Sequence, residues 1–248
     1  MNQYFLSPHA DDISLSVGGI LLKGIVKGPR NLVSVFTKGL YLKYFDHKKR
    51  YLVEEATAIR ESEDVLYCDQ ISATYNSINL KDATLRKYDD FDSIFTQKSS
   101  TCDPYYQSVE GALQKFILQL DEPFTLWCPL GIGNHIDHIL LRDVIREIPI
   151  PEENIIYYED LPYAADYDQS ELNSFCKTTI KGYTSLIVDI TKVFEKKLSL
   201  LKLYKSQVSL TEINKVMFYS SRLSRHQGYY ERLWISNKQV QNEDFYNR

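Results

Sequence analysis

Cysteine is scarce in this 248-residue chain, which has only four. They lie far apart, at positions 68, 102, 128 and 176, and form no Cys-x-x-Cys pair, so free thiols are the expected state. Free thiols are typical of a reducing cytoplasm, and a cytoplasmic protein is therefore expected. Cys128 ends an apolar stretch and is interpreted as a buried apolar residue rather than a ligand or nucleophile.

A basic excess and long apolar runs are also absent. The chain carries 29 Lys and Arg against 33 Asp and Glu, a formal net charge of −4, so it offers no electrostatic case for nucleic-acid binding. No run of about 18 apolar residues occurs, which predicts no membrane span. The first residues lack the basic and apolar regions of a signal peptide. We therefore expect neither nucleic acid nor membrane as a partner.

The hydrophobic pattern predicts an α/β fold. Apolar strands are expected near residues 4–6, 31–37, 71–75, 124–128, 154–158 and 184–190, separated by helical patterns over 13–26, 49–66, 104–120, 139–145 and 192–205. A strand, a helix and a second strand in succession form the unit of a parallel sheet with right-handed crossovers. We predict a three-layer, Rossmann-like fold, with a mostly parallel sheet and helices on both faces, in a single domain over residues 1–248.

Polar residues crowd the end of the first predicted strand. His9, Asp11 and Asp12 lie at its carboxyl end, where ligands bind in open α/β sheets. His9 and Asp12 can offer one nitrogen and one oxygen to a divalent metal, which leaves the Asp11 carboxylate free to act as a base. Alternatively, Asp11 or Asp12 only caps the helix that follows. Gly18 and Gly19 in that helix are expected to permit close approach to the sheet or site.

A second polar cluster has the same context, at the end of an apolar strand and the start of a helix. His135 and His138 are three residues apart and share one face of a helical turn. Asp137 between them can orient one imidazole. Three of the five histidines fall in the two clusters, which favours a shared site. The other two, His47 and His226, are interpreted as surface residues.

The two clusters resemble the motifs of the PIG-L/LmbE-like zinc-dependent N-deacetylases, which remove acetyl groups from amino sugars. That family's first motif reads Pro-His-x-Asp-Asp followed by Gly-Gly, as at 8–12 and 18–19, and its second reads His-x-Asp-His, as at 135–138. Helical patterns at 58–66 and 196–207 also look like family landmarks. The chain departs from the common pattern at three positions, where the family often has Pro, Glu and Pro: Ala10, Ile13 and Ile136.

The resemblance implies a hydrolase that removes an N-acetyl, or other N-acyl, group from an amino-sugar-containing small molecule by metal-activated water. Three side chains would hold Zn²⁺, or Fe²⁺, which accepts the same ligands: His9, Asp12 and His138. Asp11 would take a proton from the attacking water and could return one to the leaving amine. His135, held by Asp137, would if protonated stabilise the oxyanion.

Three further residues are candidates for substrate contact. The resemblance implies that Arg60 holds an anionic or hydroxyl-rich substrate, whereas the alternative is an ordinary helical ion pair with Glu63 or Asp64. Tyr158 and Tyr163, at and just after the end of a later strand, can stack on a sugar ring and bond its hydroxyl groups.

Residues 76–104 show no sustained periodicity, and a connection this long is expected to cover the site and set substrate choice. Two other functions stay open. A metal-dependent phosphoesterase usually uses two metals ~3.5–4 Å apart, and so more ligands than the two motifs offer. A catalytically inactive carbohydrate-binding relative would need neither Asp11 nor His135. The sequence is compatible with a homo-oligomer as well as a monomer.

Overall fold

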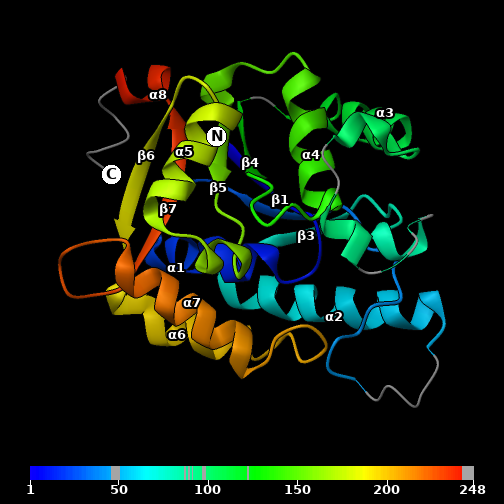
Figure 1. Ribbon diagram of the computed structural model, residues 1–248, viewed down its shortest axis with the longest axis horizontal. Helices are drawn as coiled ribbons and strands as arrows, with labels where there is room; N and C mark the ends of the chain where they lie inside the picture. The colour runs from blue at the N-terminus through cyan, green and yellow to red at the C-terminus, as the bar shows by residue number, and fades with distance from the viewer. Residues whose placement is uncertain are drawn as a thin grey trace.

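The computed structural model describes residues 1–45, 51–86, 88, 90, 92–96, 99–121 and 123–241; His47 lies outside these ranges. Seven strands form one sheet in the order β3-β2-β1-β4-β5-β7-β6 (Figure 1). The strands are β1 (Asn2–Ser7), β2 (Arg30–Ser34), β3 (Thr74–Ser77), β4 (Phe124–Pro129), β5 (Ile155–Tyr158), β6 (Tyr183–Asp189) and β7 (Tyr230–Ser236). The first five are parallel, and β7 pairs antiparallel with both β5 and β6. The predicted α/β fold with a mostly parallel sheet is therefore confirmed.

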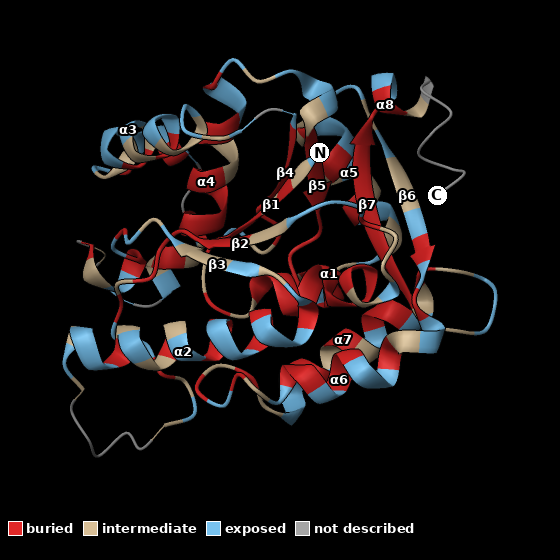
Figure 2. Cartoon of the chain, turned by 180° about the vertical axis from the view of Figure 1, so that it is seen from behind, coloured by how far each residue is buried: buried red, intermediate tan, exposed pale blue. Residues whose placement is uncertain are grey.

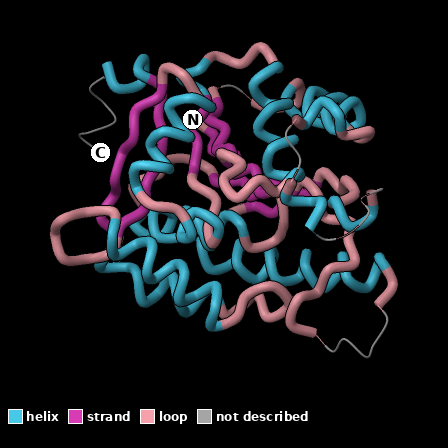
Figure 3. Tube along the Cα trace, viewed as in Figure 1, coloured by secondary structure: helices cyan, strands magenta, loops and turns pink. Residues whose placement is uncertain are grey.

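Helices cover both faces of this sheet. They are α1 (Asp12–Lys23), α2 (Val53–Ile71), α3 (Tyr106–Ile117), α4 (Ile136–Glu147), α5 (Gln169–Thr179), α6 (Phe194–Leu201), α7 (Leu210–Arg222) and α8 (Asn237–Gln241). In Figure 3, α1, α2, α6 and α7 lie on one side of the strands, and α3 and α4 lie on the other. Within the described residues, no helix is long and apolar enough to cross a membrane.

Three interior strands of the sheet are buried along their whole length. Every residue of β4, β5 and β7 is buried, whereas most of the edge strand β6 is not (Figure 2). Strands that are covered on both faces read as nearly continuous apolar runs, which is why the sequence locates β4 and β5. Cys128 of β4 is fully buried, as expected, and all four cysteines, each within the described ranges, are free thiols.

Helix α1 packs tightly against the sheet at Gly19, whereas Gly18 faces Tyr67 of α2 and Lys197 of α6. A Cβ atom on Gly19 would lie 2.5 Å from Cδ1 of Ile190 and 2.8 Å from Oε1 of Glu231. The Glu231 carboxylate accepts hydrogen bonds from the N–H groups of Gly19 and Ile20, and Lys197 forms a buried ion pair with it. The expected close approach to the sheet is confirmed for Gly19, whereas Gly18 allows close packing against two helices instead.

Four of the helices and strands have no counterpart among the predicted ones: α5, α7, β7 and α8. The β7 strand carries adjacent charges, Glu231 and Arg232, which read as a surface segment. Both are buried because each has a partner distant in sequence, Lys197 for Glu231 and Glu159 for Arg232. Helix boundaries also differ, since α2 runs on to Ile71 and α6 ends at Leu201.

Candidate functional site

A cavity of about 290 Å³ lies at the carboxyl ends of β1 and β4, where α1 and α4 begin. Both sequence motifs contribute to its wall, through His9, Asp11, Asp12, His135 and Asp137. A larger cavity of about 420 Å³ lies at the opposite, amino end of the strands, and its described lining contains no residue of either motif. The smaller cavity is therefore the candidate site.

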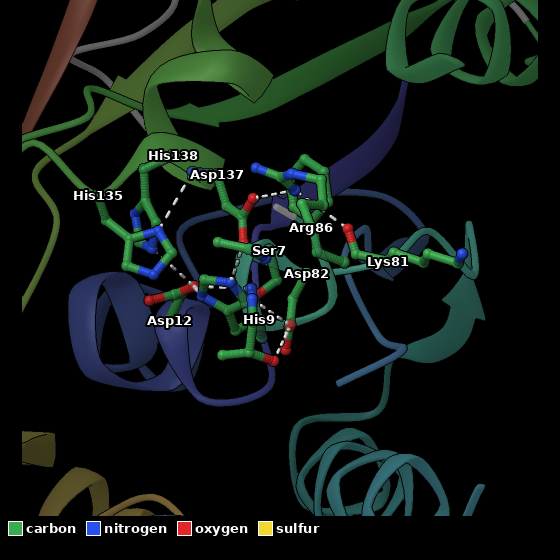
Figure 4. Close-up of polar contacts among 12 residues, drawn as sticks. Ser7, His9, Asp12, Lys81, Asp82, Arg86, His135, Asp137 and His138 are labelled. Atoms are coloured by element: carbon green, nitrogen blue, oxygen red, sulfur yellow. Dashed lines mark hydrogen bonds and ion pairs between the residues drawn. The ribbon is translucent and has the colours of Figure 1, made fainter. Parts of the chain in front are cut away.

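Three imidazoles meet in this cavity. Ring nitrogen atoms of His9, His135 and His138 all lie within 4.8 Å of one another. Figure 4 shows His135 and His138 projecting from the start of α4 toward His9 and Asp12, which come from the β1–α1 turn. Oδ2 of Asp12 lies 3.6 Å from Nδ1 of His9 and 3.5 Å from Nε2 of His138. Two nitrogens and one oxygen thus converge.

In both His9 and His138, the ring nitrogen that does not face Asp12 lies against a second carboxylate. Nε2 of His9 lies 2.9 Å from Oδ2 of Asp137, and Nδ1 of His138 lies 2.7 Å from Oδ1 of Asp160. An imidazole that donates one N–H to a carboxylate has its second nitrogen unprotonated when neutral, and that lone pair can bind a metal. The carboxylates therefore select the tautomers in which Nδ1 of His9 and Nε2 of His138 are lone-pair donors.

A divalent metal fits this arrangement. Nε2 of His138 is buried and has no hydrogen-bond partner among the described residues, an unusual state for a buried polar atom. Burial lowers the pKa of His138, but the carboxylates of Asp12 and Asp160 outweigh that effect and raise the pKa to about 9. The position therefore favours positive charge. Two imidazole nitrogens and a carboxylate oxygen, with space beside them, match a catalytic zinc site.

His135 differs from the other two imidazoles. It is the N-cap residue of α4, and its Nδ1 accepts the backbone N–H of Asp137 at 3.2 Å. Burial and the neighbouring His9 lower the pKa of His135 well below its ordinary value. A neutral His135 with Nδ1 acting as an acceptor carries its proton on Nε2. This side chain is thus arranged as a hydrogen-bond donor rather than as a metal ligand.

Asp11 adopts an unusual backbone conformation. Its φ is 90° and its ψ is −30°, a sparsely populated region for a residue with a side chain. It stands at the N-cap of α1, yet within the described chain its side chain makes no capping hydrogen bond, so the capping alternative does not hold for Asp11. Burial and the adjacent Asp12 raise the pKa of Asp11. The strained turn places this carboxylate in the cavity wall beside the converging ligand atoms.

Asp137 does not hold His135 as the sequence suggested. Its Oδ2 accepts hydrogen bonds from Nε2 of His9 and from the N–H of Ala83, both at 2.9 Å, and its Oδ1 pairs with Arg86. The Asp137 side chain reaches from the first turn of α4 toward β1, whereas the His135 ring folds back onto the N-terminus of its own helix. The Asp137 carboxylate therefore orients the imidazole of His9, whereas His135 contacts the backbone N–H of Asp137.

Two of the three residues predicted to contact the substrate line the cavity. Arg60 lines the cavity and pairs with Asp82, with Nη1 and Oδ2 2.9 Å apart, rather than with Glu63 or Asp64. Tyr163 also lines the cavity, and its ring lies edge-on to His138 with centroids 5.7 Å apart.

Tyr158, the third residue predicted to contact the substrate, is absent from the described cavity wall. It is fully buried, and its hydroxyl group donates to the carbonyl oxygen of Leu6 at 2.7 Å. Tyr158 still belongs to β5 and bonds β1, whereas Pro162 and Tyr163 in the segment after the strand line the cavity. Gly133 makes room for that loop, because a Cβ at its φ of 88° would lie 2.5 Å from Cβ of Tyr163.

Several site residues were missed by the sequence motifs. Asp160 orients His138 but reads as part of an acidic turn. Lys43 and Glu212 form an ion pair of 2.7 Å in the cavity wall, although they come from segments 169 positions apart. The segment 76–104 supplies five wall residues: Asp82, Ala83, Thr84, Ile94 and Phe95. Asp160, Lys43 and Glu212 carry no local signal, since each gains its role from a partner distant in sequence, whereas a place over the site is predicted for the segment 76–104 from its length.

Comparison with known proteins points to one family. A family model described as GlcNAc-PI de-N-acetylase (PIG-L) matches residues 4–148. A 2'-N-acetylparomamine deacetylase from Streptomyces fradiae is 28% identical over 211 residues, which are 82% of this chain and 72% of that protein. A deacetylase of the teicoplanin biosynthesis pathway superposes with a TM-score of 0.72 at 21% identity, covering 94% of this chain and 97% of that one. An N,N'-diacetylchitobiose deacetylase from Pyrococcus horikoshii gives 0.58 at 18% identity, covering 95% and 84%.

Proposed function

The chain belongs to the GlcNAc-PI de-N-acetylase (PIG-L) family, and from this membership we propose that it is a metal-dependent hydrolase that removes an N-acetyl group from an amino-sugar-containing small molecule. One observation carries the proposal. Oδ2 of Asp12 lies within 3.6 Å of both Nδ1 of His9 and Nε2 of His138, and the carboxylate of Asp11 lies in the same cavity wall. The relative that acts on an N-acetylated amino sugar supports the substrate class.

Zn²⁺ is the proposed cofactor, with Fe²⁺ as the alternative that accepts the same donors. Nδ1 of His9, Oδ2 of Asp12 and Nε2 of His138 would hold it. When bound, the cation lowers the pKa of water in the site and polarises the amide carbonyl. Asp137 and Asp160 keep the two imidazoles in the tautomers that this binding needs.

Asp11 and His135 supply the proton chemistry. The Asp11 carboxylate accepts a proton from the attacking water and returns it to the departing amine nitrogen. Nε2–H of His135 donates a hydrogen bond to the carbonyl oxygen as negative charge develops there. Because Nδ1 of His135 accepts a backbone N–H, the neutral imidazole suffices for this role, and the protonated form expected from the sequence is not required.

The remaining wall residues suit a sugar. The rings of Tyr163 and Phe95, with centroids 5.9 Å apart, form an apolar surface beside His135 and His138 on which a sugar face can pack. The Arg60–Asp82 pair offers a donor and an acceptor for ring hydroxyl groups. These contacts are part of the proposal.

The phosphoesterase alternative is less well supported. Two-metal sites need a second set of ligands ~3.5–4 Å from the first. Among the described residues, only one cluster of three or more His, Cys, Asp or Glu side chains has metal-ligand spacing, the imidazoles of His9, His135 and His138, and it lies at the site already described, so a second set of ligands is lacking there. A purely binding function would need neither the free carboxylate of Asp11 in the cavity wall nor the donor arrangement of His135.

The proposal predicts one metal per chain and activity that depends on it. The purified protein is expected to contain one equivalent of Zn²⁺ or Fe²⁺ by elemental analysis and to release primary amine from N-acetylated amino sugars. Dialysis against a chelator should abolish amine release, and one equivalent of Zn²⁺ should restore it. Two metals per chain together with phosphate-ester hydrolysis would instead support the phosphoesterase.

The different positions of the two tyrosines give a further prediction. Tyr158→Phe should leave KM unchanged and lower the free energy of unfolding by about 1–3 kcal/mol, because the buried carbonyl of Leu6 loses its partner. Tyr163→Ala should raise KM about tenfold, the equivalent of ~1.4 kcal/mol. Denaturant unfolding and steady-state kinetics measure the two effects. A KM change in Tyr158→Phe would contradict its assignment to the core.

A further inference from the structure

We propose that Arg86, in the segment between β3 and α3, is a positioning residue for the metal ligand His9 and acts on it through Asp137. The inference rests on the metal centre proposed above. Arg86 itself is absent from the described cavity wall, so it has no direct contact with substrate to explain its place. Among the described residues, the hydrogen-bonded connection from its side chain to a proposed metal ligand runs through the carboxylate of Asp137.

Arg86 is a buried charge held between two carboxylates. Its side chain is 3% exposed; Nη1 pairs with Oδ1 of Asp137, and Nη2 donates to Oδ2 of Asp103 at 2.9 Å. Nη1 also donates to the carbonyl oxygen of Lys81 at 3.1 Å. A buried guanidinium is unfavourable unless it is paired and hydrogen-bonded, and the two carboxylates supply that pairing. The forked shape of the group lets it reach both at once.

Aromatic rings fix the position of the guanidinium further. Its central carbon lies 5.5 Å from the ring centroid of Phe36, 5.8 Å from that of Tyr88 and 5.7 Å from that of Tyr105. A cation over a ring face within about 6 Å is attracted to it. These rings come from three separate parts of the chain. The ion pairs and ring contacts together therefore hold the Arg86 guanidinium in one position.

The path from Arg86 to His9 is one carboxylate long. Arg86 binds Oδ1 of Asp137, while Oδ2 accepts from the N–H of Ala83 and from Nε2 of His9. Contacts on both oxygens set the plane of the carboxylate. That plane sets the direction of the bond to Nε2 of His9, and hence the direction in which Nδ1 points. Figure 4 shows Arg86, Asp137 and His9 in this order.

The same segment also forms part of the substrate cavity. Residues 82–84 line the cavity just before Arg86 in sequence, and Ile94 and Phe95 line it after. Arg86 thus links this wall segment to Asp137, which orients the proposed metal ligand His9. Outer partners of a ligating histidine typically change metal affinity about 10–100-fold when they are altered. For Arg86, which is one hydrogen-bonded contact further from the metal than Asp137, we expect an effect near the lower end of that range.

The test is the Zn²⁺ affinity of Arg86 variants, measured by competition with a chromogenic chelator, alongside kcat and KM at saturating Zn²⁺. Arg86→Met is expected to raise the Kd for Zn²⁺ about tenfold and to lower kcat, with KM changed less than kcat. Arg86→Lys should recover part of the affinity, since an ammonium can pair with Asp137 but cannot span both carboxylates.

Asp103→Asn is the matched control, because it weakens the other side of the Arg86 pairing and leaves the contact to Asp137 in place. It should lower the melting temperature and leave the Kd for Zn²⁺ near that of the unchanged protein. In the Asp137→Asn background, adding Arg86→Met should bring little further loss of affinity if Arg86 acts through Asp137.

Unchanged Zn²⁺ affinity in folded Arg86→Met would overturn the inference. If that variant fails to fold, equal affinity losses for Arg86→Lys and Asp103→Asn would do so, since both would then reflect stability alone. Failure of the proposed function is a separate result. In that case the unsubstituted protein would bind no metal or release no amine, whatever Arg86 does.

Discussion

Replacing Asp11 by Asn is expected to lower kcat by about 10²–10⁴-fold, the range that general acid–base groups contribute, while the metal stays bound. Asp11 is the carboxylate in the cavity wall that the proposed ligand set leaves free, and an amide cannot accept the proton of an attacking water. Asn has the same shape and is among the few residues that tolerate positive φ, so the strained turn at φ 90° should survive. His9, Asp12 and His138 remain unaltered.

Two measurements on one preparation decide the role of Asp11. Amine release gives kcat, and elemental analysis gives the metal content, which should stay near one equivalent. Asp69→Asn is the matched control, because that carboxylate is exposed on α2, and it should change neither quantity. Unchanged turnover in Asp11→Asn would remove this residue from the base role. Loss of metal would instead make Asp11 a ligand.

The parts of the fold that could be predicted are those with a local signal. Strands such as β4 and β5 are buried on both faces and read as apolar runs bounded by turns. The β7 strand could not be found this way. Glu231 and Arg232 occupy two of its seven positions, and their burial depends on Lys197 and Glu159, which the chain brings to them only in the folded state.

The same distinction holds within the site. The two motifs predict which imidazoles and carboxylates gather, because both stand at strand ends that a parallel sheet brings to one edge. They do not predict which carboxylate faces which imidazole. Asp137 lies two residues from His135 in sequence but bonds His9, and Asp160 bonds His138 from 22 positions away. Side-chain direction depends on the local backbone conformation and on the packing of segments distant in sequence, which the motifs do not encode.

His138→Ala should abolish both metal binding and turnover. The side chain is fully buried and contributes one of three converging donor atoms, so the loss of metal affinity should exceed the ~10–100-fold that a change behind a ligand causes. Asp160→Asn provides that smaller change, since it alters the partner of Nδ1 and leaves Nε2 in place. The Kd for Zn²⁺ should therefore be highest in His138→Ala, intermediate in Asp160→Asn and lowest in the unsubstituted protein.

His138→Ala also removes a buried ring and leaves Asp160 without its imidazole partner, so its effect on folding stability must be measured separately from its effect on metal binding. His138→Gln keeps a polar group of intermediate size and should also lose the metal. His226→Ala is the matched histidine control, because His226 is exposed, and it should retain one equivalent and full activity. Circular dichroism and calorimetry establish which variants are folded. A folded His138→Gln protein that binds Zn²⁺ normally would refute the ligand set, because no metal centre built on His9 and Asp12 should tolerate loss of its third donor.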